Sequence, residues 1–406
     1  MKLPNWVYRL SEKVLMDSIK YPTILGEAYH DIVKYYDEVL KEYGIDTVVH
    51  EVPRDYLRKN LPESMNPDKP RYILLAKVGY GDRVLQFNGH YDIVAPGCGW
   101  KVTDPFTPKR IDNKIYGRGA SDMKGGIAAI IATLAYLASK EPPDHVVEAA
   151  IVPDEEIGGI TGTGYLVREL KSNPDWVIIA EPSGLDTIWI GHKGAVWAEV
   201  YVKGKQVHGS TPWKGVNAFE KMIYLAKYII ENIKPIIESR ESTYDYGEPE
   251  AKKPTITLGG KLTAPGSINI VPGIVGFSID RRLIVEENVE EAEKELINYI
   301  YKASKEVKAD IELKIVSRLQ PAFTDPNTEL VRRVVESASI IIGTKPRKVV
   351  CMGGLDLHYY TEKGIYAISY GPGDPDQAHM ADEYIEITSV HRAIDIYVDI
   401  SRKAFK

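Results

Sequence analysis

Strand-like and helix-like segments alternate along the first half of this chain of 406 residues. Apolar segments with the length and composition of buried strands occur at 72–79, 83–94, 145–153 and 176–184. Residues 122–140 carry apolar side chains at the spacing of a helix, and residues 162–170 open a second helix. This alternation predicts an α/β fold, in which helices flank a mostly parallel sheet.

The pattern of predicted strands and helices changes near residue 194, and helix–strand alternation resumes near residue 317. The block between these points predicts strands at 195–204, 255–259, 274–284 and 310–316, with helices at 216–237 and 288–306. A chain of this length usually has more than one hydrophobic core. We therefore expect an inserted α+β domain at 194–316, within a larger domain that is built from residues 1–193 and 317–406.

Charge and composition exclude several classes of function. The net charge of −6, from 51 basic and 57 acidic side chains, disfavours a protein that binds nucleic acid or anionic membranes. No apolar run approaches the roughly 20 residues of a membrane span, and the first residues lack the apolar core of a secretory signal. Cys98 and Cys351 are the only cysteines, so a disulfide framework is not expected. These features fit a cytoplasmic enzyme.

Residues that can bind a metal follow three of the predicted strands. The strand ends carry His90 with Asp92, then Glu155 with Glu156, and then Glu181. Ligand sites of open α/β sheets lie beyond the carboxyl ends of the strands. Asp122 stands where a loop enters a predicted helix, and a helix N-terminus favours a carboxylate.

Each of these residues also has an ordinary explanation when it is taken alone. His90 could be a hydrogen-bonded core histidine, Asp122 could cap its helix, and Glu181 could be an exposed acid at a strand end. One sheet edge that gathers a histidine and several acids, however, needs positive charge to balance them. A divalent cation would provide it, and mixed imidazole and carboxylate ligands suit zinc or a similar metal.

Five motifs along the chain resemble the M20 metallopeptidase family in their order and spacing. They are "GHYDIV" (89–94), "YGRGASDMKGG" (116–126), "VPDEEIGG" (152–159), "AEPS" (180–183) and "AHMADEYI" (378–385). The inserted block adds "HGSTPWKGVNA" (208–218), "INIVP" (268–272) and "DRR" (280–282). The family includes acetylornithine deacetylase, succinyl-diaminopimelate desuccinylase, aminoacylase and carboxypeptidase G2, and the resemblance covers essentially the whole chain.

The resemblance implies a site for two divalent metal ions per chain. Asp122 would bridge both ions, His90 and Glu181 would complete one site, and Glu156 and His379 would complete the other. Zinc is the expected metal, with cobalt or manganese as possible substitutes. The resemblance also implies a cis peptide bond between Asp122 and Met123.

Other residues of the motifs would support the reaction around these ions. Asp92 would hold the second nitrogen of His90, and Glu155 would be the general base. Asp154 is expected either to be structural or to support a metal ligand without touching the metal. His208, in the inserted block, would donate a hydrogen bond to the oxyanion, from the same chain or from the other subunit of a homodimer formed through that block.

The resemblance also suggests substrate-binding residues. Asn269 and Arg282 match positions that hold a carboxylate or amide of the substrate, and Gly353 and Gly354 match a glycine-containing loop that approaches it. The expected function is hydrolysis of the amide bond of N-acyl amino acids or short peptides by metal-activated water. The segment "GHKGAVW" (191–197) departs from the arginine-rich version of the desuccinylases, so the acyl group stays open.

Two other functions stay open at this stage. Co-catalytic zinc aminopeptidases share the order of the ligands, although the inserted block with "HGSTPWKGVNA" argues against them. A non-catalytic binder of small molecules could retain the fold, but binding alone would not need the base Glu155.

Overall fold

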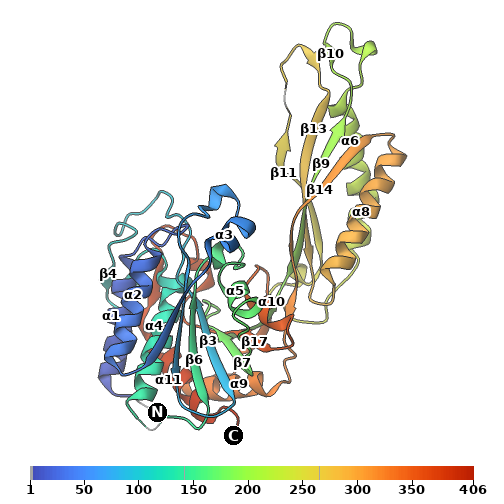
Figure 1. The fold of residues 1–406 in the computed structure, drawn as a ribbon. Coiled ribbons are helices and arrows are strands. Elements are labelled where there is room, and N and C mark those ends of the chain that lie inside the picture. Colours follow the sequence, from blue (N-terminus) through green and yellow to red (C-terminus); the bar gives the residue numbers. More distant parts are fainter. Residues whose placement is uncertain (1–2, 141, 265) are drawn as a thin grey trace. The chain divides into compact units, whose positions relative to one another are not determined.

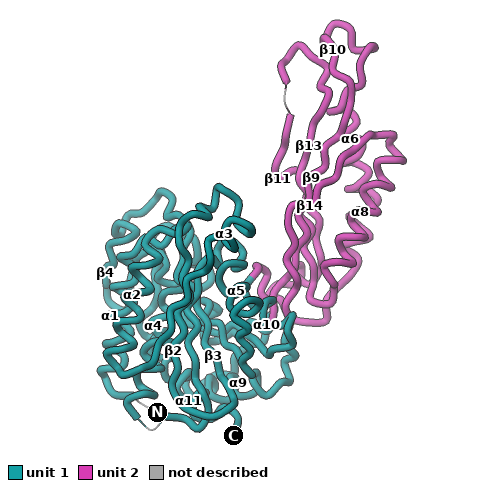
Figure 2. The backbone as a smooth tube through the Cα atoms, in the orientation of Figure 1, with its two compact units in different colours: residues 1–190, 323–349, 355–406 teal, residues 191–322, 350–354 magenta. Residues whose placement is uncertain are grey.

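The computed structural model describes residues 3–140, 142–264 and 266–406, and the chain forms two compact units (Figure 2). Unit 1 comprises residues 1–190, 323–349 and 355–406, and unit 2 comprises residues 191–322 and 350–354. The insertion expected at 194–316 falls within unit 2.

A mixed sheet of nine strands forms the centre of unit 1, in the order β1-β2-β6-β3-β7-β17-β8-β15, with β16 paired to β8. Its middle is parallel, because β3 runs parallel to β6 and β7, and β17 runs parallel to β7. The pairs β1–β2, β2–β6 and β17–β8 are antiparallel, so the expected mostly parallel sheet applies to the centre only. The bounds are β1 (Asp46–Glu51), β2 (Tyr72–Val78), β3 (Val84–His90), β6 (Val146–Val152), β7 (Trp176–Ile179), β8 (Thr187–His192), β15 (Ala322–Phe323), β16 (Arg347–Cys351) and β17 (Tyr366–Ser369).

Helices flank this sheet, as Figure 1 shows. Helix α4 packs against α1 and α11 and touches β3 and β6, and its apolar side chains are buried all round, as expected for a helix enclosed by other elements. No helix of the described ranges is both long and apolar enough to cross a membrane. The bounds are α1 (Asn5–Ile19), α2 (Tyr29–Glu42), α3 (Arg54–Asn60), α4 (Gly125–Ala138), α5 (Thr163–Arg168), α9 (Glu329–Ile342), α10 (Leu357–Thr361) and α11 (Ile387–Lys403).

Short elements carry the loops at the ends of these strands. A small antiparallel sheet has the order β18-β5-β4, with β4 (Lys109–Ile111), β5 (Lys114–Tyr116) and β18 (Tyr384–Glu386). Single turns of helix occur at η1 (Glu63–Met65), η3 (Glu155–Ile157) and η7 (Pro375–Gln377), and η2 (Ala120–Lys124) is a kinked turn that leads into α4.

Unit 2 is an antiparallel sheet with helices on one face, as its sequence predicts. The strand order is β11-β13-β9-β14, and a two-stranded ribbon, β10–β12, stands apart from it. Along β9, alternate residues are buried, which is the pattern of a sheet covered on one side. The bounds are β9 (Gly194–Lys203), β10 (Val207–His208), β11 (Thr255–Thr263), β12 (Ile270–Val271), β13 (Ile274–Leu283), β14 (Asp310–Leu319), α6 (Ala218–Tyr228), α7 (Lys234–Glu238) and α8 (Val289–Glu306), with short turns η4 (Pro212–Lys214), η5 (Ile229–Ile233) and η6 (Pro249–Lys252).

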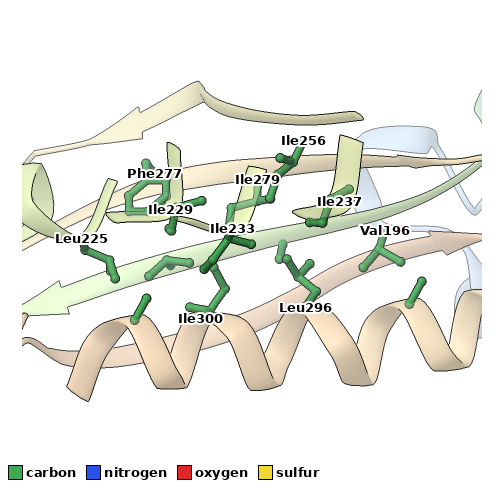
Figure 3. Packing of buried hydrophobic residues seen from close by; sticks show 14 of the residues in the cluster. Val196, Leu225, Ile229, Ile233, Ile237, Ile256, Phe277, Ile279, Leu296 and Ile300 are labelled. Atoms are coloured by element: carbon green, nitrogen blue, oxygen red, sulfur yellow. The ribbon is translucent and has the colours of Figure 1, made fainter. Parts of the chain in front are cut away.

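The core of unit 2 lies between this sheet and its helices (Figure 3). Leu225, Ile229, Ile233 and Ile237 recur every fourth residue, and all four are buried against the sheet. The long helix expected at 216–237 is interrupted by the π-helical turn η5. Pro235 lies just beyond η5 and has no N–H to donate, so regular α-helical hydrogen bonding cannot continue through this point.

Candidate metal centre

The three consecutive acids after β6 lie in different surroundings. Asp154 is fully buried and has a left-handed backbone conformation, with a φ of 63°. Its carboxylate accepts hydrogen bonds from Arg71 Nε at 2.7 Å, Tyr29 Oη at 2.9 Å and Thr161 Oγ1 at 2.5 Å. Asp154 therefore holds the start of the turn in the core, which is a structural role.

Asp92 joins the end of β3 to the turn that carries the two glutamates. Its Oδ1 accepts the backbone N–H of Glu155 at 3.2 Å, and its Oδ2 accepts that of Glu156 at 3.1 Å. The carbonyl oxygen of Asp92 lies 3.0 Å from His90 Nδ1, nearer than the carboxylate at 3.5 Å. A proton on Nδ1 donates to that carbonyl, which leaves His90 Nε2 as the nitrogen available to a cation.

Two histidine–carboxylate clusters share Asp122. In the first, His90 Nε2 lies 3.2 Å from Asp122 Oδ1 and 3.6 Å from Glu181 Oε1. In the second, His379 Nε2 lies 3.0 Å from Glu156 Oε2 and 3.5 Å from Asp122 Oδ2. Within each cluster the potential ligand atoms all lie within 4.8 Å of one another. The structure thus brings together all five residues that the resemblance implies as ligands.

The electrostatics of both clusters show a shortage of positive charge. Burial raises the pKa of Glu155 and of Glu181 well above its usual value. Hydrogen bonds that His379 donates to Asp122 and Glu156 raise its pKa to about 10. For Asp122, burial alone would raise the pKa, but the hydrogen bonds of the two histidines lower it.

The residues present fit a pair of divalent cations. Glu181 Oε1 is buried and makes no hydrogen bond among the described residues. A buried carboxylate oxygen without a donor is costly, and a cation would compensate it. Two imidazoles and three carboxylates, with one carboxylate common to both clusters, form a donor set suited to zinc or a similar metal.

A buried ion pair that we did not anticipate supports the second cluster. Arg118 Nη1 donates to Glu383 Oε2 at 2.7 Å, and both side chains are nearly inaccessible to solvent. The Glu383 carboxylate also accepts the backbone N–H groups of Gly119, Ser121 and Asp122, at 2.9, 2.8 and 3.1 Å. The motifs "YGRGASDMKGG" and "AHMADEYI" contain both charges, but nothing in their spacing shows that they meet.

Arg118 also reaches the backbone of a candidate ligand. Its Nη2 donates to the carbonyl oxygen of His379 at 3.2 Å. The Asp122–Met123 peptide bond is cis, as the family resemblance implies.

Asp356 is a second buried acid that sequence reasoning missed. It is 2% exposed, and burial raises its pKa to about 7. A side chain at Gly159 would meet its Oδ1 at 2.0 Å, and Gly159 also has a φ of 66°. Residue 159, three positions after Glu156, must therefore be glycine for the turn to lie against Asp356.

Unit 2 contains the remaining predicted site residues, which we describe within that unit. His208 is exposed at the end of β10, and Asn269 immediately precedes β12. The two segments are joined by a hydrogen bond from the Gly209 N–H to the carbonyl oxygen of Asn269 at 2.7 Å. His208 and Asn269 therefore lie on neighbouring strands of one ribbon.

The two arginines of "DRR" point to opposite faces of the unit 2 sheet. Arg281 is buried on the helix side, where its Nη2 pairs with Glu287 at 2.7 Å. Arg282 lies on the open face, where Nε contacts Asp280 Oδ1 at 2.9 Å and the guanidinium stacks over the ring of Trp197. Of these two arginines, Arg282 is the one that is partly exposed.

The loop glycines of unit 2 differ in the space around them. A side chain at Gly353 would make only ordinary contacts, whereas one at Gly354 would meet the Leu319 side chain at 2.5 Å. Within unit 2, the close approach at Gly354 is thus to Leu319.

Comparison with known proteins identifies the family. The sequence profile of peptidase family M20/M25/M40 matches residues 86–403. The chain belongs to this family. An uncharacterized metallohydrolase from Methanocaldococcus jannaschii is 27% identical over 417 residues, which cover 96% of this chain and 97% of that protein.

Two further relatives extend the comparison of this M20 chain. A succinyl-diaminopimelate desuccinylase from Nautilia profundicola is 27% identical over 357 residues, covering 86% of this chain and 91% of that protein. An M20 family metallo-carboxypeptidase from Sulfolobus solfataricus has the same fold, with a TM-score of 0.76 at 22% identity over 97% of this chain and 98% of that one. The expected fold class is confirmed, and the M20 chain is a metal-dependent hydrolase.

Proposed function

We propose that this protein is a binuclear hydrolase that cleaves the amide bond of N-acyl amino acids or short peptides. The observation that carries the proposal is that the two oxygens of the Asp122 carboxylate face different clusters. Oδ1 lies 3.2 Å from His90 Nε2, and Oδ2 lies 3.5 Å from His379 Nε2. A carboxylate that offers one oxygen to each of two clusters is suited to bridge two cations. His90 with Glu181, and His379 with Glu156, would complete the two sites.

Two divalent cations at these residues would polarise the scissile carbonyl and make a water molecule easier to deprotonate. Zinc is the proposed metal, because structures that combine imidazole and carboxylate ligands commonly bind it. His90 enters as a neutral ligand, since its Nδ1 proton is held by the Asp92 carbonyl. Asp122 would enter as a carboxylate, because two nearby cations favour its charged form.

Glu155 is the proposed general base. Its backbone N–H is held by Asp92, next to Glu156, whose side chain contacts His379. Burial raises the pKa of the Glu155 carboxyl, which makes it a better proton acceptor than an exposed carboxylate. Glu155 would take a proton from the attacking water and then deliver it to the leaving amine.

Unit 2 supplies the proposed contacts to the substrate. His208 would donate a hydrogen bond to the oxyanion that forms at the carbonyl. Arg282 presents a partly exposed guanidinium on the open face of the sheet, and a guanidinium suits a substrate carboxylate. Asn269, beside His208 on the ribbon, would bind a neighbouring oxygen of the substrate.

We also propose a homodimer formed through unit 2. Strands β11 and β14 are the outer strands of its sheet, and an outer strand can pair with a second copy. Helix α6 exposes Phe219, Ile223 and Tyr224, and Trp213, in the turn η4 that precedes this helix, is 75% exposed. Apolar side chains that cluster on a surface favour its burial against another protein.

Metal analysis and a substrate screen test the proposed reaction together. The purified protein should contain about two divalent ions per chain, and removing them with a chelator should abolish the hydrolysis of N-acetyl-, N-succinyl- or N-carbamoyl-amino acids or dipeptides. Zinc should restore it. Hydrolysis that persists without metal, or no retained metal, would end the proposal. Cleavage restricted to peptides with a free amino terminus would instead indicate an aminopeptidase.

Mixing two inactive variants tests whether His208 acts across the dimer. Glu155→Gln and His208→Ala should each be inactive alone. If His208 serves the other subunit, half of randomly exchanged dimers have one intact site, and about one quarter of wild-type activity should return. The absence of recovery after verified subunit exchange would show that His208 acts within its own chain.

A further inference from the structure

The ring of His208 is held by the backbone of the residue two positions later. The Ser210 N–H donates to His208 Nδ1 at 3.1 Å, and Ser210 Oγ lies 2.7 Å from the same nitrogen. The turn is closed by the Thr211 N–H, which donates to the His208 carbonyl at 2.9 Å. The opposite strand fixes it through the hydrogen bond from Gly209 to Asn269.

These contacts define which ring nitrogen of neutral His208 has the proton. A serine hydroxyl can donate or accept, so Ser210 Oγ alone leaves both tautomers open. A backbone N–H can only donate, and it cannot rotate away while the turn is closed. Nδ1 must therefore be the acceptor of the neutral ring, and the proton must be on Nε2.

We propose that Ser210 is a positioning residue, whose backbone N–H keeps neutral His208 in the Nε2–H tautomer. The Nδ1–H tautomer would bring two N–H groups face to face at 3.1 Å. It would also turn a lone pair, rather than a hydrogen, from Nε2 toward a ligand. With the proton on Nε2, the ring presents a donor on its side away from the turn.

Asn269, on the neighbouring segment of the ribbon, also presents a hydrogen-bond donor. The Ser267 hydroxyl donates to Asn269 Oδ1 at 2.7 Å, which identifies Oδ1 as the acceptor side of the amide and leaves the NH2 group on the other side to donate. His208 and Asn269 thus both offer hydrogen-bond donors from one ribbon. Two such donors suit an anionic oxygen of a ligand, such as an oxyanion or a carboxylate.

The catalytic meaning of this arrangement rests on the proposed function, in which His208 donates the Nε2 hydrogen to the oxyanion. A donor that is already in the correct tautomer costs nothing to reorganise when charge develops on the substrate. The tautomer itself, however, is a property of the ribbon and can be measured without any substrate.

The ring carbon shifts of 13C-labelled histidine report the tautomer directly. In the full-length, metal-loaded protein at pH 8, His208 should show the Nε2–H pattern, and the His208→Gln variant identifies its signal by loss. The same residue in the urea-unfolded chain gives the reference mixture of tautomers. A wild-type signal that matches the Nδ1–H form, or the unfolded mixture, would overturn the proposal.

Two substitutions at residue 210 distinguish the effect of the backbone N–H on the His208 tautomer from the effect of the serine hydroxyl. Ser210→Ala keeps the N–H and should keep the Nε2–H pattern, whereas Ser210→Pro removes the N–H and should shift the signal toward the unfolded mixture. An unchanged tautomer in Ser210→Pro would overturn the assigned role. Proline could instead distort the ribbon, and the signals of unit 2 would then change throughout. In that case the wild-type spectrum alone determines whether the proposed tautomer is correct.

Kinetics then connect the tautomer to catalysis. Losing one oxyanion donor usually lowers kcat about 10²–10³-fold, so His208→Ala should show a loss of this size with little change in KM. Ser210→Pro leaves a mixture of tautomers rather than no donor, so its kcat should fall between those of the wild type and His208→Ala. Ser210→Ala should retain most activity. If no substrate is hydrolysed but the Nε2–H pattern is found, the proposed function fails and this inference stands. If substrates are hydrolysed and the ring is Nδ1–H, this inference fails alone.

Discussion

Arg118 and Glu383 form a buried ion pair, with 2.7 Å between Nη1 and Oε2, that joins the two chain segments behind the Asp122–His379 cluster. Glu383 accepts the backbone N–H of Asp122, and Arg118 donates to the carbonyl oxygen of His379. Neither side chain needs to contact a cation to change the affinity of the site for it. The pair sets where the carboxylate of Asp122 and the ring of His379 can lie relative to each other.

Weakening this pair should reduce metal affinity, in addition to the stability lost when Arg118 is left buried without its charged partner. Glu383→Gln keeps the size of the side chain but loses its charge, and changes in groups that support metal ligands typically cost 10–100-fold in affinity. Competition with a chelator measures the effect. Glu12→Gln is the matched control, because Glu12 also pairs with an arginine, Arg110, on unit 1. Equal metal affinity in both variants would contradict the role of the pair.

The neighbours Glu155 and Glu156 should separate catalysis from metal binding. Glu155→Gln should keep close to the wild-type metal content and lower kcat by roughly two to four orders of magnitude, the usual contribution of a general base. Glu156→Gln removes a charged partner of His379 and should lose about one of the two ions. Elemental analysis and steady-state kinetics on both variants measure this. Equal losses of metal and activity would refute the division of roles.

The Arg71–Asp154 pair should be essential to stability. Both side chains are fully buried, so Arg71→Met leaves an unpaired carboxylate in the core, which usually costs about 3–5 kcal/mol of unfolding free energy. Urea unfolding of the metal-free protein measures the loss. Arg58→Met removes an exposed pair with Asp68 and should change stability far less. Similar losses in the two variants would show that Asp154 is not held as the structure indicates.

His358 should make unit 1 sensitive to acid. Burial lowers its pKa to about 4, and its Nδ1 lies 2.9 Å from the Leu355 carbonyl oxygen. Between about pH 6.5 and 4 the unfolded chain binds a proton that the folded chain does not, so stability falls as pH falls through this window, by roughly 3 kcal/mol at most.

The His358→Phe variant isolates this contribution. The slope of unfolding free energy against pH between 6.5 and 4 should be shallower in the variant than in the wild type, with the other titrating groups common to both. Parallel slopes would show that His358 is protonated equally in the folded and unfolded chains.

The ends of the strands could be read from the sequence because their position follows from topology. Parallel strands bring their carboxyl ends to one edge, so His90 and Glu181 were expected near each other from local patterns alone. His379 lies far along the chain, and only the order of motifs connected it to the others. The two arginines of "DRR" could be assigned to opposite faces once a strand was expected there, because side chains alternate.

Other features depend on contacts that no local pattern reveals. Arg118 and Glu383 are 265 residues apart and meet only because β18 pairs with β5. The buried acid Asp356 lies against Gly159 for a similar reason, since its loop and the glutamate turn are brought together by the fold. The interruption of the long helix in unit 2 could have been suspected from Pro235, which cannot donate to the preceding turn.

The position of β17 has a consequence for protein synthesis. Strands β7 and β8 are consecutive in the chain, yet β17, at Tyr366–Ser369, lies between them in the sheet. While the ribosome is still translating unit 2, the nascent chain has made β7 but not the strand that will pair with its outer edge. His379 emerges later still. A prematurely terminated chain that ends before residue 366 would therefore expose a strand edge and lack a metal ligand, which makes it a substrate for quality control rather than a partly active enzyme.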